Sequence, residues 1–143
     1  GSLDIAVLYV APRLPGVVAE LLFEEKLVLV RTAPVDRPLA ADDHVRIDWG
    51  PDFAAGYQAA FPDQPNAVVS IDYGPLALDY ILATGGSGYF REGFIQSHIE
   101  QGRLARVPDS PEFSYSAYAV HSATADAGVI ERARRGLHAA AAA

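Results

Sequence analysis

The sequence contains no cysteine, no methionine and only one tryptophan. Without cysteine the chain can form neither a disulfide framework nor a thiolate zinc site. Its longest apolar runs, such as residues 27–30, have the length of one β-strand. A membrane-spanning helix needs about 20 apolar residues, so no segment of this sequence is expected to cross a membrane.

Basic residues are also scarce. The chain has 11 basic and 18 acidic residues, which give a formal net charge of −7. This is the wrong sign for a surface that neutralises phosphates, so we expect the chain by itself not to bind duplex DNA. A length of 143 residues is typical of one domain. No basic and apolar leader is visible, which makes the cytoplasm the expected compartment.

Motifs of catalysis and metal binding are incomplete. The stretch Gly85-Gly86-Ser87-Gly88-Tyr89 lacks the final glycine of a nucleophile elbow, and no lysine follows it as a phosphate-binding loop requires. The glycines are better explained as a helix end that lets the backbone approach a neighbouring element. The four histidines are scattered along the chain. We therefore predict no catalytic residue, no metal site and no cofactor.

Apolar periodicity divides the chain into alternating strands and helices. Residues 17–30 hold two strand-like runs, interrupted by polar residues near Lys26, which indicates a hairpin or a sheet crossing. A short strand or turn is expected at 88–90 and a helical turn at 94–101. The remaining expected strands are 3–10, 45–47, 67–71, 104–107 and 113–121, and the expected helices are 51–61, 75–84 and 125–138. This alternation predicts an α/β sheet with helices on its faces.

Two junctions repeat one design, in which a strand is followed by Asp, an aromatic residue, Gly and Pro. In both, proline stands at the first helical position and glycine at the N-cap, where it offers no side-chain oxygen to the helix N–H groups. Two such ends at the carboxyl edge of one parallel sheet would face a crevice suited to a ligand. An equally weighted interpretation is that Gly-Pro is only a good helix start. The candidate ligand-binding residues are Asp48, Trp49, Gly50, Tyr73, Gly74, Tyr89 and Phe90.

The order of these pieces resembles the effector-binding domain of LysR-type transcriptional regulators. Single motifs are loose, and their order of appearance carries the resemblance over nearly the whole chain. The similar segments are Leu3-Asp4-Ile5-Ala6, Pro15 to Val30, Pro38-Leu39-Ala40, Ile47 to Phe53, Leu78 to Phe90 and Gly102-Arg103-Leu104.

The resemblance implies a periplasmic-binding-protein-like fold of type 2, in which a mixed sheet is flanked by helices and a small effector binds between two lobes. It also implies a homo-oligomer that contacts DNA only through an N-terminal helix-turn-helix absent from this chain. Residues 16–117 would form lobe 2, and residues 3–15 with 118–143 a remnant of lobe 1. The expected partners are thus a small effector and further copies of the chain.

Two alternatives come from other classes of protein. The chain could be a fragment of a periplasmic-type solute-binding protein, which shares the bilobal fold and would be favoured by a signal peptide or a lipid-anchor cysteine. It could also be a small α/β enzyme, which requires a convergent set of acid and base residues that the sequence does not display.

Overall fold

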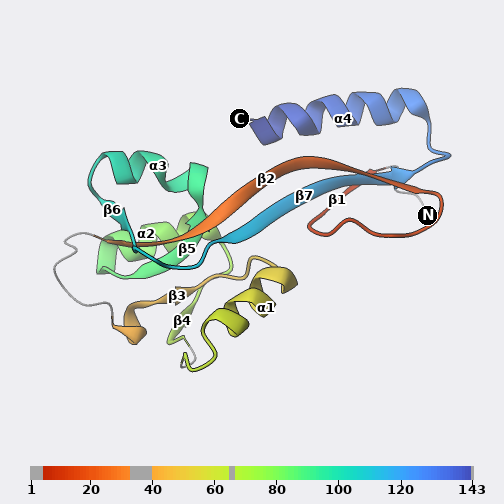
Figure 1. Cartoon of the computed structure of the whole chain (residues 1–143). Coiled ribbons are helices and arrows are strands. Elements are labelled where there is room, and N and C mark those ends of the chain that lie inside the picture. The colour runs from red at the N-terminus through yellow and green to blue at the C-terminus, as the bar shows by residue number, and fades with distance from the viewer. Residues whose placement is uncertain (1–4, 33–39, 65–66, 143) are drawn as a thin grey trace. The chain divides into compact units, whose positions relative to one another are not determined.

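The computed structural model describes residues 5–32, 40–64 and 67–142. It confirms the expected α/β class, because a mixed sheet is flanked by helices (Figure 1). Expectations for residues 1–4 and 33–39 lie outside the described residues. In chain order the elements are β1 (Ile5–Leu8), β2 (Val17–Thr32), a 3-10 helix (Ala41–Asp43), β3 (Val45–Arg46), α1 (Pro51–Ala60), β4 (Val69–Ser70), α2 (Gly74–Thr84), β5 (Ser87–Arg91), α3 (Glu92–Glu100), β6 (Leu104–Arg106), β7 (Phe113–Ser122) and α4 (Ala127–Ala142).

The chain forms two compact units, which are described separately. Unit 1 comprises residues 1–24 and 116–143, and unit 2 comprises residues 25–115. The boundaries expected from the sequence were 15/16 and 117/118. Both β2 and β7 continue through the observed boundaries as single strands, so no turn or change of composition marks these positions.

Unit 1 is built from strands and the C-terminal helix. Strand β1 pairs antiparallel with β7, and Ile5 lies opposite His121. The helix α4 is tied to β2 by Arg134, whose Nε donates to the Glu20 carboxylate at 2.6 Å. The terminal alanines belong to this helix as far as Ala142.

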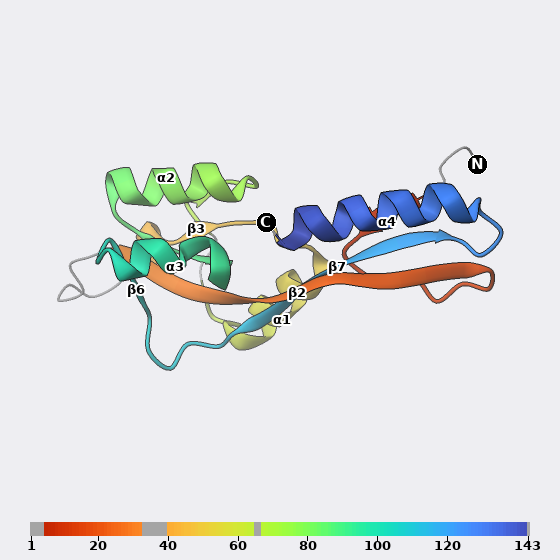
Figure 2. The same ribbon diagram turned by 90° about the horizontal axis from the view of Figure 1, so that it is seen from above.

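Unit 2 has a core on each face of its sheet. Strand β2 pairs antiparallel with β5, and successive side chains of β5 alternate between the two faces. Phe90 enters a core with residues of α2 and α3, whereas Tyr89 enters a second core with Phe53 and Tyr57 of α1. Figure 1 shows α1 and α3 on opposite sides of the strands, and Figure 2 shows the same three helices from above.

The Gly85-Gly86 turn has the role expected from the sequence. Gly85 caps the end of α2 with a φ of 80°. Gly86 has a φ of 151°, and a Cβ at this position would come within 2.5 Å of the Asp43 carbonyl oxygen. Only glycine allows this close approach, which brings β5 beside the chain entering β3.

Two predicted elements were wrong in extent. Of the two interpretations of residues 17–30, a hairpin or a sheet crossing, the hairpin is wrong, because β2 is one continuous strand of 16 residues. Its polar stretch stays extended because Glu25 pairs with Arg91 and the Lys26 ammonium lies 3.3 Å from the Glu112 carboxylate. The helical turn expected at 94–101 is the helix α3, which begins two residues earlier. Of the short strand or turn expected at 88–90, the strand is confirmed as β5.

We expect Phe90→Ala to lower the free energy of unfolding by about 3–5 kcal/mol, since Phe90 is fully buried and its removal leaves a cavity. Phe94→Ala is the matched control, because Phe94 is 40% exposed on α3. Its cost should be about 1 kcal/mol or less. Urea unfolding followed by Trp49 fluorescence measures both. Equal losses would contradict the placement of Phe90 in the core.

Candidate functional site

Three helices of unit 2 begin at the same edge of the sheet. Strands β3 and β4 pair in parallel, with Val45 opposite Val69. A parallel bridge between His44 and Ser87 places β5 beside β3 in the same direction. Each of the three strands leads into a helix, so the N-termini of α1, α2 and α3 follow the carboxyl ends of neighbouring strands. We call residues 48–51 and 72–75 the helix-start edge.

The first junction of this edge joins β3 to α1. Gly50 is the N-cap, with φ 97° and ψ 173°, and no side chain caps the helix. The Asp48 carboxylate accepts a hydrogen bond from the Gly50 N–H at 2.9 Å and so stabilises the turn. The Trp49 indole Nε1 donates to the Tyr89 carbonyl at 3.0 Å, which ties the junction to β5.

The second junction joins β4 to α2 and differs from the sequence prediction by one residue. Tyr73, not Gly74, is the N-cap, and Gly74 is already helical. The Tyr73 backbone is extended, and Tyr73 is 65% exposed. Like α1, α2 has no side-chain cap at its N-terminus. A Cβ at Gly74 would lie 3.3 Å from the Trp49 ring, so the two junctions are in contact.

The structure thus brings together five of the seven candidate residues. Asp48 and Tyr73 are exposed at the helix-start edge, while Trp49, Gly50 and Gly74 are half-buried there. Tyr89 and Phe90 are adjacent in β5 and point to opposite faces, so they do not share one site. Tyr89 contributes its carbonyl to Trp49, and Phe90 is fully buried in the core on the other face.

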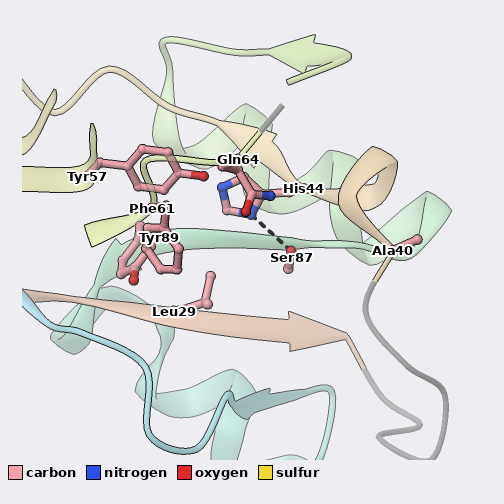
Figure 3. A pocket seen from close by; sticks show the side chains of 8 residues that line it. All are labelled: Leu29, Ala40, His44, Tyr57, Phe61, Gln64, Ser87 and Tyr89. Atoms are coloured by element: carbon pink, nitrogen blue, oxygen red, sulfur yellow. Dashed lines mark hydrogen bonds between the residues drawn. The ribbon is translucent and has the colours of Figure 1, made fainter. Parts of the chain in front are cut away.

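A cavity of about 290 Å³ lies on the α1 face of unit 2 (Figure 3). His44 Nδ1 lies 3.0 Å from the Ser87 hydroxyl oxygen, and the His44 ring stacks on Tyr57 at a centroid distance of 5.9 Å. The lining residues are Leu29, Ala40, His44, Tyr57, Phe61, Gln64, Ser87 and Tyr89. We call this cavity the α1 pocket.

Sequence reasoning missed this pocket, apart from Tyr89. His44 was dismissed because no second histidine lies near it in the sequence, and Ser87 because its glycine motif is incomplete. Tyr57 and Phe61 have the spacing of a helix that faces a core. With Leu29 of β2, the lining residues come from four separate segments and converge only in the fold, so no local signal could have joined them.

Burial controls the protonation of the pocket. Desolvation lowers the pKa of His44, and the positive charge of Arg46 lowers it further. Burial raises the pKa of Tyr57, against the opposing effect of Arg46. Burial and the neighbouring Tyr57 also raise the pKa of Tyr89. At neutral pH the histidine is therefore uncharged and both phenols keep their protons.

The described residues contain no group of three or more His, Asp or Glu side chains that could hold a metal ion. None of the described helices has the length and apolar character needed to cross a membrane.

The lowered pKa of His44 makes stability depend on pH. Protonation favours the unfolded chain, where the histidine has its ordinary pKa of about 6.5. The free energy of unfolding should therefore be highest above that value and fall as the pH drops from about 7.5 to 5.5. In His44→Gln this decline should be smaller. Urea unfolding at a series of pH values measures it, and an unchanged slope in the variant would contradict the assignment.

Comparison with known proteins rests on structure. No protein-family model matches the sequence, and no curated protein matches it either. The regulatory domain of HypT from Salmonella typhimurium, bromide-bound, superposes with a TM-score of 0.75 at 20% identity. The match covers 96% of this chain and 73% of that domain.

Two further solved structures come from full-length proteins. DarR from Vibrio fischeri, in complex with DNA, has a TM-score of 0.73 at 15% identity, over 94% of this chain and 50% of that one. LysG from Corynebacterium glutamicum, with bound effector arginine, has a TM-score of 0.71 at 17% identity, over 99% of this chain and 52% of that one. This chain therefore spans about half the length of these regulators. It has the fold of the regulatory domains of LysR-type transcriptional regulators, which is periplasmic-binding-protein-like of type 2.

Proposed function

We propose that the chain is the ligand-sensing regulatory part of a LysR-type transcriptional regulator, with a role in binding and not in catalysis. The observation that carries the proposal is the contact between two helix starts without side-chain caps, at the carboxyl ends of parallel strands. Open α/β sheets bind ligands at this kind of edge. The fold shared with HypT and LysG supports the same class of function.

The helix-start edge offers a small effector three kinds of contact. The first backbone N–H groups of α1 and α2 are donors that no side chain caps. Trp49 and the exposed Tyr73 offer aromatic surface. Asp48 and Asp72 are exposed and offer carboxylates to cationic or hydroxyl groups. We propose Asp48, Trp49, Gly50, Tyr73 and Gly74 as the effector-binding residues of this chain.

DNA binding is assigned to a part of the intact regulator outside this sequence. The net charge of −7 opposes contact with phosphates, and DarR, in complex with DNA, is about twice the length matched here. We infer that unit 2 corresponds to lobe 2 and unit 1 to a remnant of lobe 1. A regulator that acts on DNA is expected in the cytoplasm. The fold alone would also suit a solute-binding protein, but the neighbours described above are regulators.

A test of the effector site uses Trp49, the only tryptophan, as a fluorescent reporter at the helix-start edge. Amino acids, small carboxylates and halides are screened for ligands that change this fluorescence. We expect Tyr73→Ala to weaken binding of such a ligand about three- to tenfold, through loss of an aromatic contact. In the intact regulator, DNA affinity without effector should stay nearly unchanged.

The matched control is Tyr80→Ala, because Tyr80 is also exposed and lies further along α2. It should bind the ligand as the unaltered chain does. If folded Tyr73→Ala also binds normally, Tyr73 has no part in the site.

We also propose that unit 1 mediates oligomerisation. Among the described strands, β1 stands at the end of the strand order and leaves one edge unpaired. Apolar side chains of unit 1 are exposed in a number unusual for a free surface. They are Val7, Leu8, Tyr9, Val10, Leu14, Val18 and Leu21, each at least 40% exposed.

The chain should therefore self-associate, and its average mass should rise across a sedimentation concentration series. We expect Leu21→Glu to shift the distribution toward monomer, because it places a charge in the apolar surface. Leu76→Glu, at an exposed position of unit 2, is the control that leaves association unchanged. A monomer at every concentration would refute the proposal.

A further inference from the structure

The α1 pocket and the helix-start edge lie at opposite ends of the same elements. Strand β3 runs from His44, in the pocket, toward Asp48, at the edge. Helix α1 then returns from Pro51 to its C-cap Phe61, which lines the pocket. Ten helical residues span about 15 Å, so one small molecule does not fill both places.

The walls of the α1 pocket are largely aromatic. Tyr57 and Phe61 have centroids 4.9 Å apart, and Tyr89 lies 6.1 Å from the first and 6.5 Å from the second. Leu29, opposite Tyr89 on β2, adds an aliphatic side chain. Aromatic rings at these separations offer faces and edges that favour a flat, ring-containing ligand over an irregular one.

Polar groups stand at one side of the pocket. Ser87 is only 2% exposed, and its bond to Nδ1 orients the His44 ring. The other imidazole nitrogen, Nε2, has no hydrogen-bond partner among the described residues, and neither does the Gln64 side-chain amide. Figure 3 shows the Tyr57 hydroxyl pointing toward the His44 ring. A ligand can therefore exchange one or two hydrogen bonds here.

The described lining of the pocket carries no formal charge. Among the residues that the structure describes, none that lines the pocket is Asp, Glu, Lys or Arg. The lowered pKa of His44 and the raised pKa values of Tyr57 and Tyr89 keep these groups neutral. The Arg46 guanidinium carbon lies 4.7 Å from the centroid of the Tyr57 ring, in a cation–π contact. A charged ligand would lose hydration without gaining a charged partner among the described lining residues.

We propose that the α1 pocket is a second ligand site, which binds an uncharged aromatic molecule of one or two rings that carries a hydroxyl or N–H group. The size follows from the volume of about 290 Å³. An apolar cavity of about 150 Å³ accepts benzene, so this one has room for one ring with substituents or two fused rings. The site is additional to the effector site proposed at the helix-start edge and does not depend on it.

Titration calorimetry of the chain at neutral pH, with phenol and 2-naphthol as probes, tests the proposal. We expect phenol to bind with a dissociation constant on the order of a millimolar or lower. 2-Naphthol should bind about tenfold more tightly because its second ring buries more apolar surface. Cyclohexanol and benzoate should each bind about tenfold more weakly than phenol, since one lacks the ring system and the other is charged.

Ala40→Phe is the blocking variant. Ala40 is an exposed residue that lines the pocket. Its hydrogen bond, from Asp43 N–H to the Ala40 carbonyl, involves only backbone atoms. A larger side chain at this position should therefore fill the pocket without disturbing the fold. Binding of 2-naphthol should fall at least about tenfold. Ala55→Phe, on an exposed position of α1 outside the pocket, is the matched control and should bind normally. Circular dichroism and Trp49 fluorescence check that both variants fold.

Tyr73→Ala separates the two sites, because it should retain binding of 2-naphthol even if it loses an effector. Undiminished binding in folded Ala40→Phe would overturn the assignment to the α1 pocket. Equal binding of cyclohexanol and phenol would overturn the aromatic class, and tighter binding of benzoate would overturn the uncharged class. Loss of binding in Tyr73→Ala with retention in Ala40→Phe would move the probe to the helix-start edge.

Discussion

The antiparallel pairing of β2 with β5 is the interaction on which the rest of unit 2 depends. Because the side chains of paired strands alternate between faces, Leu27, Leu29 and Tyr89 all turn toward α1. Val28, Val30 and Phe90 turn toward α2 and α3. A slip of one residue in this register would exchange the two cores and leave neither helix layer with a matching surface.

Helix α1 connects the two places where we propose that small molecules bind. Its N-terminus contributes Gly50 and Pro51 to the helix-start edge, and its C-terminal half contributes Tyr57 and Phe61 to the α1 pocket. Trp49, just before the helix, is held to the Tyr89 carbonyl, and the Tyr89 side chain lines the pocket.

Close approach of β5 to β3 requires small residues as much as hydrogen bonds. Gly86 allows the chain to pass the Asp43 carbonyl, and a Cβ at Gly88 would lie 3.0 Å from the Phe90 ring and 3.4 Å from the Val45 carbonyl. The bridge between His44 and Ser87 follows directly from this proximity. The glycine-rich stretch 85–89 therefore contributes Ser87 and Tyr89 to the lining of the α1 pocket.

Local patterns in the sequence were enough to predict the α/β class, most strands and helices, and the two Gly-Pro helix starts. These depend on alternation, helical spacing and the fixed φ of proline, which are properties of neighbouring residues. The parallel pairing of β3 and β4 then placed the two junctions together, as the repeated design had suggested. The start of α2 was misplaced by one residue because a glycine before proline is compatible with either the cap or the first turn.

Only the tertiary structure decided the continuity of β2, the two separate cores that Tyr89 and Phe90 enter, and the α1 pocket. Glu25 and Lys26 remain in a strand because they form ion pairs with Arg91 and Glu112. Both partners lie far away in the sequence. His44 and Ser87 are 43 residues apart, and their meeting depends on the order and direction of strands. Local propensity carries no information about such long-range pairings, which are settled by the packing of the whole unit.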